Sequence, residues 1–350
     1  MAYRKLLTAF TALISACALA LTGCAGPLFA ASSADGTTVV FANTGGTLAE
    51  IFAANAYPEL ESAGMTVAEE SPNNEAKLTA MVQGGNPTWD VYYSTPYNAI
   101  SGCGTLFEEL DLSRIDTSGL DRDQVSDCGV PIIGSAMLLV YNKAKYGANP
   151  PTGWADFFDT TRFPGTRGIM NFAKDAGMET ALLADGVPGD QLYPLDYDRA
   201  FDKLDQIRSS TRFYTTGAQQ TQGLESGEID MMLAWPGRAY DAAAAGTDLG
   251  VAWDEPLLFF DAITIVKGAR NLDGAYDLIN ALMGQQNQQA IADRLPYQPM
   301  NSAAHVSDDP LIREFVNGPQ SRGTAVERDN NWWAENRDEA TRKWTEWVNQ

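Results

Sequence analysis

The stretch TTVVFANTGGTLAEIFAANAYPELESAGMTVAEES, residues 37–71, decides the fold class. Residues 37–43 predict a strand, residues 47–64 have the apolar spacing of a helix, and residues 65–71 predict a second strand. Residues 74–85, NEAKLTAMVQGG, then predict a helix that ends in two glycines, and TWDVYYST (88–95) predicts a third strand. This β-α-β-α-β order predicts an α/β fold with a mostly parallel sheet and helices on both faces.

The loops that follow two of these strands are the first candidates for a binding site. ANTGGT (42–47) and YSTPYN (93–98) are short and polar, and they contain Gly or Pro. In open α/β sheets, ligands bind beyond the carboxyl ends of the strands. We therefore expect both loops to border a cleft.

A second alternating unit occupies the middle of the chain. Strands are expected at 134–146, 166–172, 229–235, 249–253 and 259–268, and helices at 177–186, 196–210, 238–246, 272–295 and in the Trp-rich tail. Two sheet-forming units predict two lobes with a cleft between them. A single large α/β domain is the alternative that this length allows.

The N-terminus predicts export. Arg4 and Lys5 precede a short apolar run that ends in small residues, which indicates a signal peptide over 1–23 rather than a membrane span. LTGC, ending at Cys24, resembles the bacterial lipobox, so Cys24 is the expected lipid anchor; simple secretion, with cleavage near AASSADG, is the alternative. Residues 24–35 are then expected to form a flexible tether.

The remaining cysteines predict one disulfide. Cys103 and Cys128 are left after the signal and the anchor are set aside, in a chain that has left the reducing cytoplasm. Their pairing would stabilise the fold by about 3 kcal/mol. A metal site is the weaker interpretation, because no further ligands have the right spacing. The single histidine, His305, lies in a loop-like segment and is expected to be structural.

The net charge and the absence of common enzyme motifs limit the classes of function that are open to this chain. The formal net charge is −21, and removal of Arg4 and Lys5 with the signal brings it to −23. This excess of acid argues against nucleic acids and anionic membranes as partners. It would favour a cationic solute, or serve only solubility. No P-loop, G-x-S-x-G or H-E-x-x-H motif is present, and no cofactor is expected. An exported hydrolase with a carboxylate pair stays open.

Five segments, taken in order, resemble one family. They are PTGWADFFDTTRFPGTRGI (151–169), ALLADGVP (181–188), SGEIDMMLAWPGRA (226–239), ITIVKGARNLDGAYDLIN (263–280) and LPYQPMNSAA (295–304). These segments are similar to extracellular solute-binding proteins of ABC importers, in the branch that includes spermidine- and putrescine-binding proteins. The resemblance implies a monomeric receptor that is not an enzyme and that delivers a small amine to a membrane permease.

The same resemblance implies a type II periplasmic-binding-protein fold with two crossing strands, near 131–140 and 259–266. The first lobe would comprise 36–133 plus 263–305, and the second 134–262 plus 306–350. The lobes would close around the ligand by a hinge motion.

The resemblance also implies site residues. Trp235 would be an aromatic wall, Asp261 an ammonium-binding carboxylate and Glu179 an acid at a helix start. Weaker candidates are Ser94, Tyr97, Thr44, Tyr297, and Phe259 or Phe260. Without the family context, Trp235 could be core, Glu179 could serve only the helix dipole, and the tyrosines could simply pack.

Departures from the polyamine pattern leave the ligand open. Residues 44–46 are Thr-Gly-Gly where polyamine binders have an aromatic pair, and Ala176 to Met178 replace a second acid. Arg238 adds a cation near Trp235, although it could pair with a carboxylate of its own lobe. A polyamine such as putrescine or spermidine is the main prediction. A zwitterionic γ-amino acid is the alternative, and an anion or metal binder of the same fold is a further one.

Overall fold

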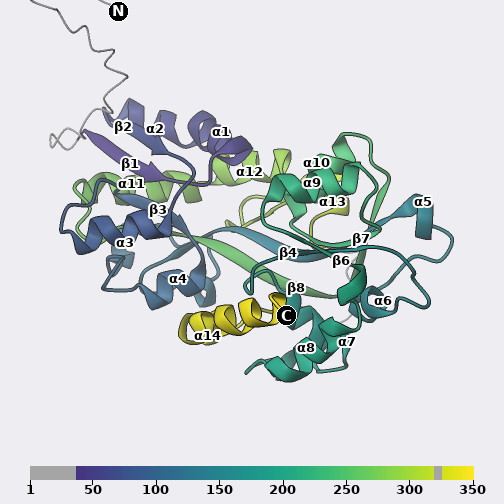
Figure 1. The fold of residues 1–350 in the computed structure, drawn as a ribbon. Helices are drawn as coiled ribbons and strands as arrows, with labels where there is room; N and C mark the ends of the chain where they lie inside the picture. Colours follow the sequence, from purple (N-terminus) through teal and green to yellow (C-terminus); the bar gives the residue numbers. More distant parts are fainter. Residues whose placement is uncertain (1–36, 319–324) are drawn as a thin grey trace, which may run out of the picture. The chain divides into compact units, whose positions relative to one another are not determined.

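A single mixed β-sheet organises the part of the chain that the structure, a computed structural model, describes: residues 37–318 and 325–350 (Figure 1). The strands are β1 Thr38–Ala42, β2 Thr66–Glu70, β3 Val91–Ser94, β4 Val130–Asn142, β5 Arg167–Met170, β6 Thr211–Tyr214, β7 Met231–Ala234, β8 Leu249–Ile265, β9 Gln298–Pro299 and β10 Val326–Glu327. Their order is β2-β1-β3-β8-β4-β7-β5-β6, with β10 on β8 and β9 on β4. The predicted signal peptide, Cys24 and the tether lie outside the described residues.

Helices cover both faces of this sheet (Figure 1). They are α1 Gly46–Asn55, α2 Tyr57–Ser62, α3 Glu75–Gln83, α4 Pro96–Ser101, α5 Lys143–Tyr146, α6 Trp154–Phe158, α7 Gly177–Ala184, α8 Tyr197–Asp205, α9 Gly217–Glu225, α10 Pro236–Ala244, α11 Leu272–Met283, α12 Gln285–Arg294, α13 Pro310–Glu314 and α14 Asn330–Val348. The predicted α/β class is confirmed. No helix within the two described ranges is long and apolar enough to cross a bilayer.

Two long antiparallel strands join the halves of the sheet. β4 and β8 pair from Val130 opposite Ile263 to Asn142 opposite Leu249. The parallel strands β1, β2 and β3 lie on one side of this pair, and β5, β6 and β7 lie on the other. We call these sides, with their helices, the first and the second lobe. The exact residue limits of the lobes stay a prediction.

β8 differs from its prediction, which placed two strands at 249–253 and 259–268. The chain instead continues as one strand through Glu255, which has a left-handed φ of 50°. The partner strand shifts register between Met137 and Leu139, close to this irregularity. A bulge of this kind bends a strand without ending it.

Two predicted helices are each divided in the structure. The helix expected over 47–64 breaks at Ala56, because Pro58 has no N–H to donate and is tolerated only in the first turn of a helix, here α2. The helix expected over 272–295 breaks at Gly284, whose extended ψ of 144° ends α11. Strand β6 and helix α9 were not predicted.

Each lobe packs apolar side chains on both faces of its part of the sheet. In the first lobe, one core gathers Phe41, Ile51 and Ile279, and a smaller one surrounds Trp89. The second lobe has its largest core beneath α6, α7, α8 and α14, and another beneath α9 and α10. Packing on both faces fixes each lobe separately, which leaves β4 and β8 to set how the lobes meet.

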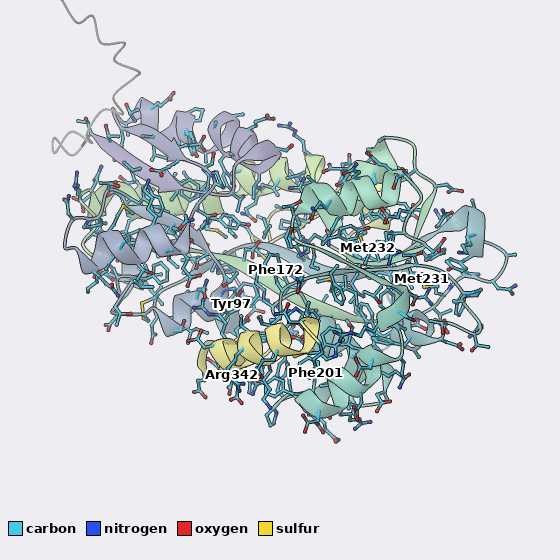
Figure 2. The ribbon with its side chains drawn as sticks, in the orientation of Figure 1. Tyr97, Phe172, Phe201, Met231, Met232 and Arg342 are labelled. Carbon is cyan, nitrogen blue, oxygen red and sulfur yellow. A yellow bond between two sulfur atoms is a disulfide. The ribbon has the colours of Figure 1, made fainter. Side chains whose placement is uncertain are left out.

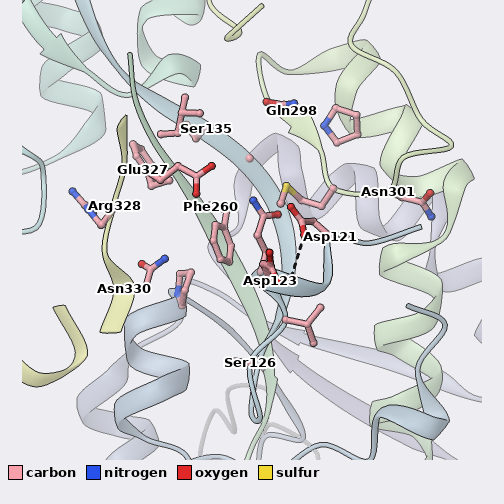
Figure 3. Close-up of a pocket in the computed structure, with 18 of the residues that line it drawn as sticks. Asp121, Asp123, Ser126, Ser135, Phe260, Gln298, Asn301, Glu327, Arg328 and Asn330 are labelled. Carbon is pink, nitrogen blue, oxygen red and sulfur yellow. Dashed lines mark hydrogen bonds between the residues drawn. The ribbon is translucent and has the colours of Figure 1, made fainter. Parts of the chain in front are cut away.

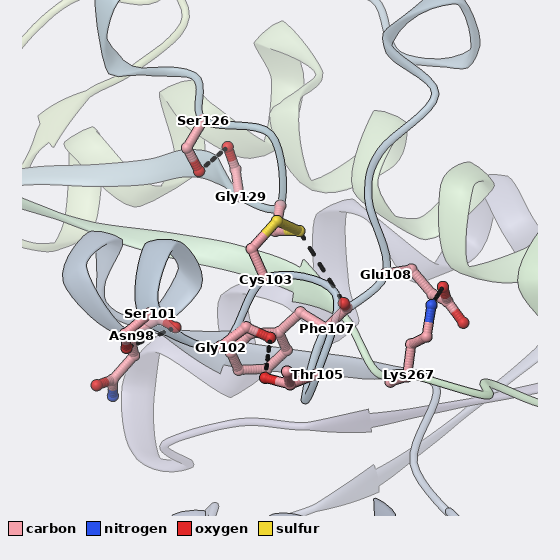
Figure 4. Close-up of a disulfide and its surroundings, with 11 residues drawn as sticks. Asn98, Ser101, Gly102, Cys103, Thr105, Phe107, Glu108, Ser126, Gly129 and Lys267 are labelled. Carbon is pink, nitrogen blue, oxygen red and sulfur yellow. Dashed lines mark hydrogen bonds and ion pairs between the residues drawn. A yellow bond between two sulfur atoms is a disulfide. The ribbon is translucent and has the colours of Figure 1, made fainter. Parts of the chain in front are cut away.

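The predicted disulfide is confirmed. Cys103, just after α4, bonds to Cys128, just before β4, across 25 residues of chain (Figure 4). Glu108, in the loop that the disulfide closes, has its Oε2 2.6 Å from Nζ of Lys267, which follows β8. The disulfide therefore ties the loop after α4 to the start of a crossing strand.

Removing this bond should destabilise the protein. For a loop of this length, we expect the double variant Cys103→Ala/Cys128→Ala to lose about 3 kcal/mol of unfolding free energy in urea titrations. Alanine is chosen because Cys128 is fully buried and a serine hydroxyl there would add its own cost. Wild-type protein treated with a reductant is the control and should match the variant. Equal stability of variant and oxidised wild type would contradict the prediction.

Candidate functional site

The ends of strands from both lobes meet one face of β8. Phe259 and Asp261 share this face by strand alternation, whereas Phe260 points to the opposite one. Tyr97 of helix α4, Lys174 of the loop after β5 and Trp235 at the end of β7 lie near it. This is the carboxyl-end position at which open sheets bind ligands.

Asp261 is the carboxylate at the centre of this face. The Tyr93 hydroxyl donates to Oδ2 of Asp261 over 2.9 Å. Burial raises the pKa of Asp261 to about 6, while the Tyr93 hydrogen bond, Lys174 and Arg328 oppose that rise. Tyr297 is also close, since Asp261 adds to the burial that raises the pKa of this tyrosine to about 12. Asp261 is thus a costly negative charge that a ligand ammonium would stabilise.

Trp235 stands at the end of β7 as the N-cap of α10. Its indole Nε1–H donates to Oδ1 of Asp175 over 3.3 Å, and its backbone N–H donates to Oε1 of Gln220, also over 3.3 Å. Asp175 is only 7% exposed, and its Oδ2 has no hydrogen-bond partner among the described residues. Burial raises the pKa of Asp175 against Lys174 and Arg328. Trp235 and Asp175 are therefore held together by a hydrogen bond between their side chains.

Arg328 is a buried cation close to these side chains, and it was not among the residues predicted from the sequence. It follows β10, which adds two residues to the edge of β8. Its guanidinium carbon lies 5.4 Å from the ring centre of Phe259 and 5.3 Å from that of Trp333. The side chain is 7% exposed, yet Nε and Nη2 have no hydrogen-bond acceptor in the described ranges. Buried donors of this kind are expensive unless a ligand supplies an acceptor.

Glu179 is the counter-ion of Arg328. Its Oε1 lies 3.4 Å from Nη2 of Arg328 and accepts from Nε1–H of Trp333 over 3.0 Å and from the Tyr193 hydroxyl over 3.2 Å. Burial raises the pKa of this carboxyl, against the attraction of Arg328. Burial lowers the pKa of Arg328, but Glu179 and neighbouring groups raise it overall. The predicted acid at the start of α7 therefore holds a cation.

The other predicted residues divide between this face and elsewhere. Ser94 and Tyr97 are buried beside it, with Oγ of Ser94 unpartnered among the described residues and the Tyr97 ring 6.1 Å from that of Trp333. Thr44 is exposed in the loop after β1. Arg238 is half-exposed and pairs with Asp241 of its own helix at 3.3 Å. Pairing within its own lobe is the arrangement that the sequence left open for Arg238.

Phe260 lines a cavity that Phe259 and Arg328 also border, so this cavity adjoins the residues described above (Figure 3). This cavity of about 1160 Å³ also receives Asp121, Asp123, Gln298 and Asn301. The carboxylate of Asp121 accepts from the backbone N–H of Asp123 over 3.1 Å and so serves a local turn. The sequence could not decide between Phe259 and Phe260, because one residue of register exchanges the two faces.

Comparison with known proteins gives the family. Residues 53–314 match the family model described as bacterial extracellular solute-binding protein. The gamma-aminobutyric acid-binding protein of Pseudomonas aeruginosa is 32% identical over 298 residues, which is 83% of this chain and 84% of that one. The spermidine/putrescine-binding periplasmic protein of Escherichia coli is 25% identical over 211 residues, 57% of this chain and 59% of that one.

Solved structures agree with this result. The structure described as the Atu4243-GABA receptor superposes with a TM-score of 0.81 at 34% identity, covering 89% of this chain and 97% of that one. The protein AgtB of A. tumefaciens R10, solved with agropinic acid, gives a TM-score of 0.76 at 26% identity over 90% and 99% of the two chains. The predicted periplasmic-binding-protein fold is confirmed. This chain belongs to the bacterial extracellular solute-binding proteins, which are receptors of ABC transporters and not enzymes.

Proposed function

We propose that this receptor captures a small zwitterionic amino acid whose ammonium and carboxylate are far apart, such as γ-aminobutyric acid. The observation that carries the proposal is Arg328, a buried guanidinium with two donors that find no hydrogen-bond acceptor among the described residues. A ligand carboxylate would satisfy both donors in the fork geometry that arginine favours. Asp261 would take the ammonium, and Trp235 would cover the alkyl segment.

A polyamine suits this site less well, although it was the main prediction from the sequence. Its second ammonium would need another carboxylate, whereas Arg328 and Lys174 both act on Asp261. Like charges at short range in a buried site repel strongly. The proteins described as binding GABA also have higher identities to this chain, 32% and 34%, than the E. coli polyamine binder at 25%. The zwitterionic alternative is therefore preferred, and the hydrolase alternative is wrong for a family of receptors.

Delivery to a membrane permease follows from the family, and we propose that lipid on Cys24 tethers the receptor near that permease. A tether would raise the local receptor concentration at the membrane without further contacts. Mass spectrometry of the membrane fraction should find Cys24 acylated and residues 1–23 removed.

Arg328 tests the ligand class. Arg328→Gln should weaken GABA binding roughly 100-fold in isothermal titration calorimetry, because charge-assisted hydrogen bonds to the carboxylate are lost. Putrescine binding should not weaken, since it has no carboxylate. Arg238→Gln is the matched control and should bind GABA like the wild type, because Arg238 pairs with Asp241 of its own helix.

Folding must be separated from binding in this test, because Arg328→Gln leaves Glu179 buried without its cation. The double variant Arg328→Gln/Glu179→Gln removes both charges and should fold at least as well as the single variant. It should bind GABA as weakly as Arg328→Gln does. Tighter binding of putrescine than of GABA by the wild type, or an undiminished GABA affinity of Arg328→Gln, would contradict the proposal.

Asp261 predicts how binding depends on pH. Only the ionised carboxylate attracts an ammonium, and the pKa of Asp261 is about 6. The dissociation constant for GABA should therefore rise about tenfold between pH 7.5 and pH 5. Asp261→Asn should bind weakly at both values and lose most of this dependence. A wild-type constant that is flat across this range would count against Asp261 as the ammonium site.

The raised pKa of Asp261 affects stability in the opposite direction: a rise in pH should strengthen GABA binding but destabilise the ligand-free fold. The folded pKa of Asp261 lies above the ordinary value of 3.8, so its stabilising contribution is full below about pH 4 and is lost as the pH rises through 6. At pH 7.5 we therefore expect ligand-free Asp261→Asn to be more stable than the wild type, by roughly 1–3 kcal/mol. Thermal unfolding at pH 7.5 and at pH 4 checks this, with the difference disappearing at the lower value.

A further inference from the structure

Helix α14 is anchored in the second lobe by three tryptophans. Nε1–H of Trp344 donates to Oδ1 of Asn171 over 3.1 Å, and Nε1–H of Trp347 donates to Oδ1 of Asp205 over 2.9 Å. Trp333 is fully buried against Glu179. Phe201 of α8 stacks on Trp347 at 5.4 Å between ring centres, beneath α14 (Figure 2). This helix therefore moves with the second lobe.

Another side chain of the same helix reaches the first lobe. Nη1 of Arg337 lies 2.9 Å from Oε1 of Glu75, the first residue of α3, and also donates to Oδ1 of Asn98 in α4. Nδ2–H of Asn98 donates in turn to Oε2 of Glu75 over 3.2 Å. Both acceptors belong to the helices that flank β3 in the first lobe. One guanidinium thus contacts two elements of the opposite lobe.

We propose that Arg337 is a positioning residue that latches the closed receptor and so sets how long the ligand stays bound. The contact to Glu75 and Asn98 exists only while α3 and α4 lie against α14. Hinge opening, which moves the lobes as rigid bodies, must break it. Because a ligand enclosed between lobes leaves only when they open, a stronger latch slows dissociation.

Arg337 is also connected to the ligand-facing side chains through its own helix. Trp333 lies four residues earlier, on the same face of α14, and donates to Glu179, the counter-ion of Arg328. The Tyr97 ring, next to Asn98 in α4, lies 6.1 Å from the ring of Trp333. Closing the latch therefore brings Tyr97 against Trp333, which already lies beside Arg328. This inference rests on the proposed capture between lobes, but it does not depend on which solute is captured.

The test compares variants that share one helix. Arg337→Ala should raise the GABA dissociation constant about tenfold, mostly through faster dissociation in stopped-flow displacement, because an ion pair and a charge-assisted hydrogen bond are lost. Arg337→Lys keeps the positive charge but loses the forked guanidinium, so its GABA dissociation constant should lie between those of the wild type and Arg337→Ala. Arg342→Ala is the control, since Arg342, labelled in Figure 2, pairs at 2.8 Å with Glu346 of its own helix.

An exchange of charges separates the latch from a general structural role. Arg337→Glu should repel Glu75 and weaken GABA binding more than Arg337→Ala does. Adding Glu75→Arg to Arg337→Glu should recover most of the loss, which a mere defect of α14 would not allow. A GABA constant for Arg337→Ala within twofold of the wild type, or no recovery in the exchanged pair, would overturn the latch.

The latch can be tested even if GABA does not bind. Spin labels at Ser62→Cys in the first lobe and Asp202→Cys in the second would report the lobe distance in ligand-free receptor. Both positions are exposed. Arg337→Glu should shift the distances to longer values, and the exchanged pair should reverse the shift. Identical distributions would overturn the latch, whereas failure of wild-type GABA binding alone would overturn only the proposed ligand.

Discussion

The buried guanidinium of Arg328 is the interaction on which the arrangement of the site depends. A charge with 7% exposure needs compensation, and the fold supplies it in part through Glu179 and the faces of Phe259 and Trp333. The compensation stops short of full hydrogen bonding, since two donors lack acceptors among the described residues. A solute that provides a carboxylate completes what the protein leaves incomplete, and its binding free energy includes the relief of that desolvation.

The pairing of opposite charges, rather than the total charge of the site, is what favours a zwitterionic solute over a diamine. Asp175, Glu179 and Asp261 face Lys174 and Arg328, and burial raises the pKa of all three carboxyls. Burial is the largest cause of each shift, so each carboxyl retains its proton more easily than it would in water. A zwitterion would supply an ammonium to Asp261 and a carboxylate to Arg328 without changing the total charge. A diamine would bring a second cation into the reach of Arg328.

The sequence predicts this fold well because its strands and helices alternate with clear apolar patterns. Of the residues in the proposed site, the sequence predicts Trp235 and Asp261, because Trp235 ends an apolar strand and Asp261 is a charged residue within one. Arg328 is missed because its strand, β10, has two residues and thus no period to detect. Phe259 and Phe260 could not be distinguished, since only the register decides which face each occupies. Residue types alone likewise could not show that Arg238 pairs inside its own helix.

The acidic surface takes on a different meaning once the ligand is a zwitterion. A formal charge of −21, or −23 without Arg4 and Lys5, would accelerate the approach of a polycation. A molecule with no net charge gains little from such a field, which is further screened within about 8 Å at physiological salt. The acid excess then contributes to solubility, and capture depends on the short-range fit at Arg328 and Asp261. In such a receptor, selectivity comes from the enclosed site and from the time it stays closed, so α14, which contacts both lobes, belongs to the recognition machinery.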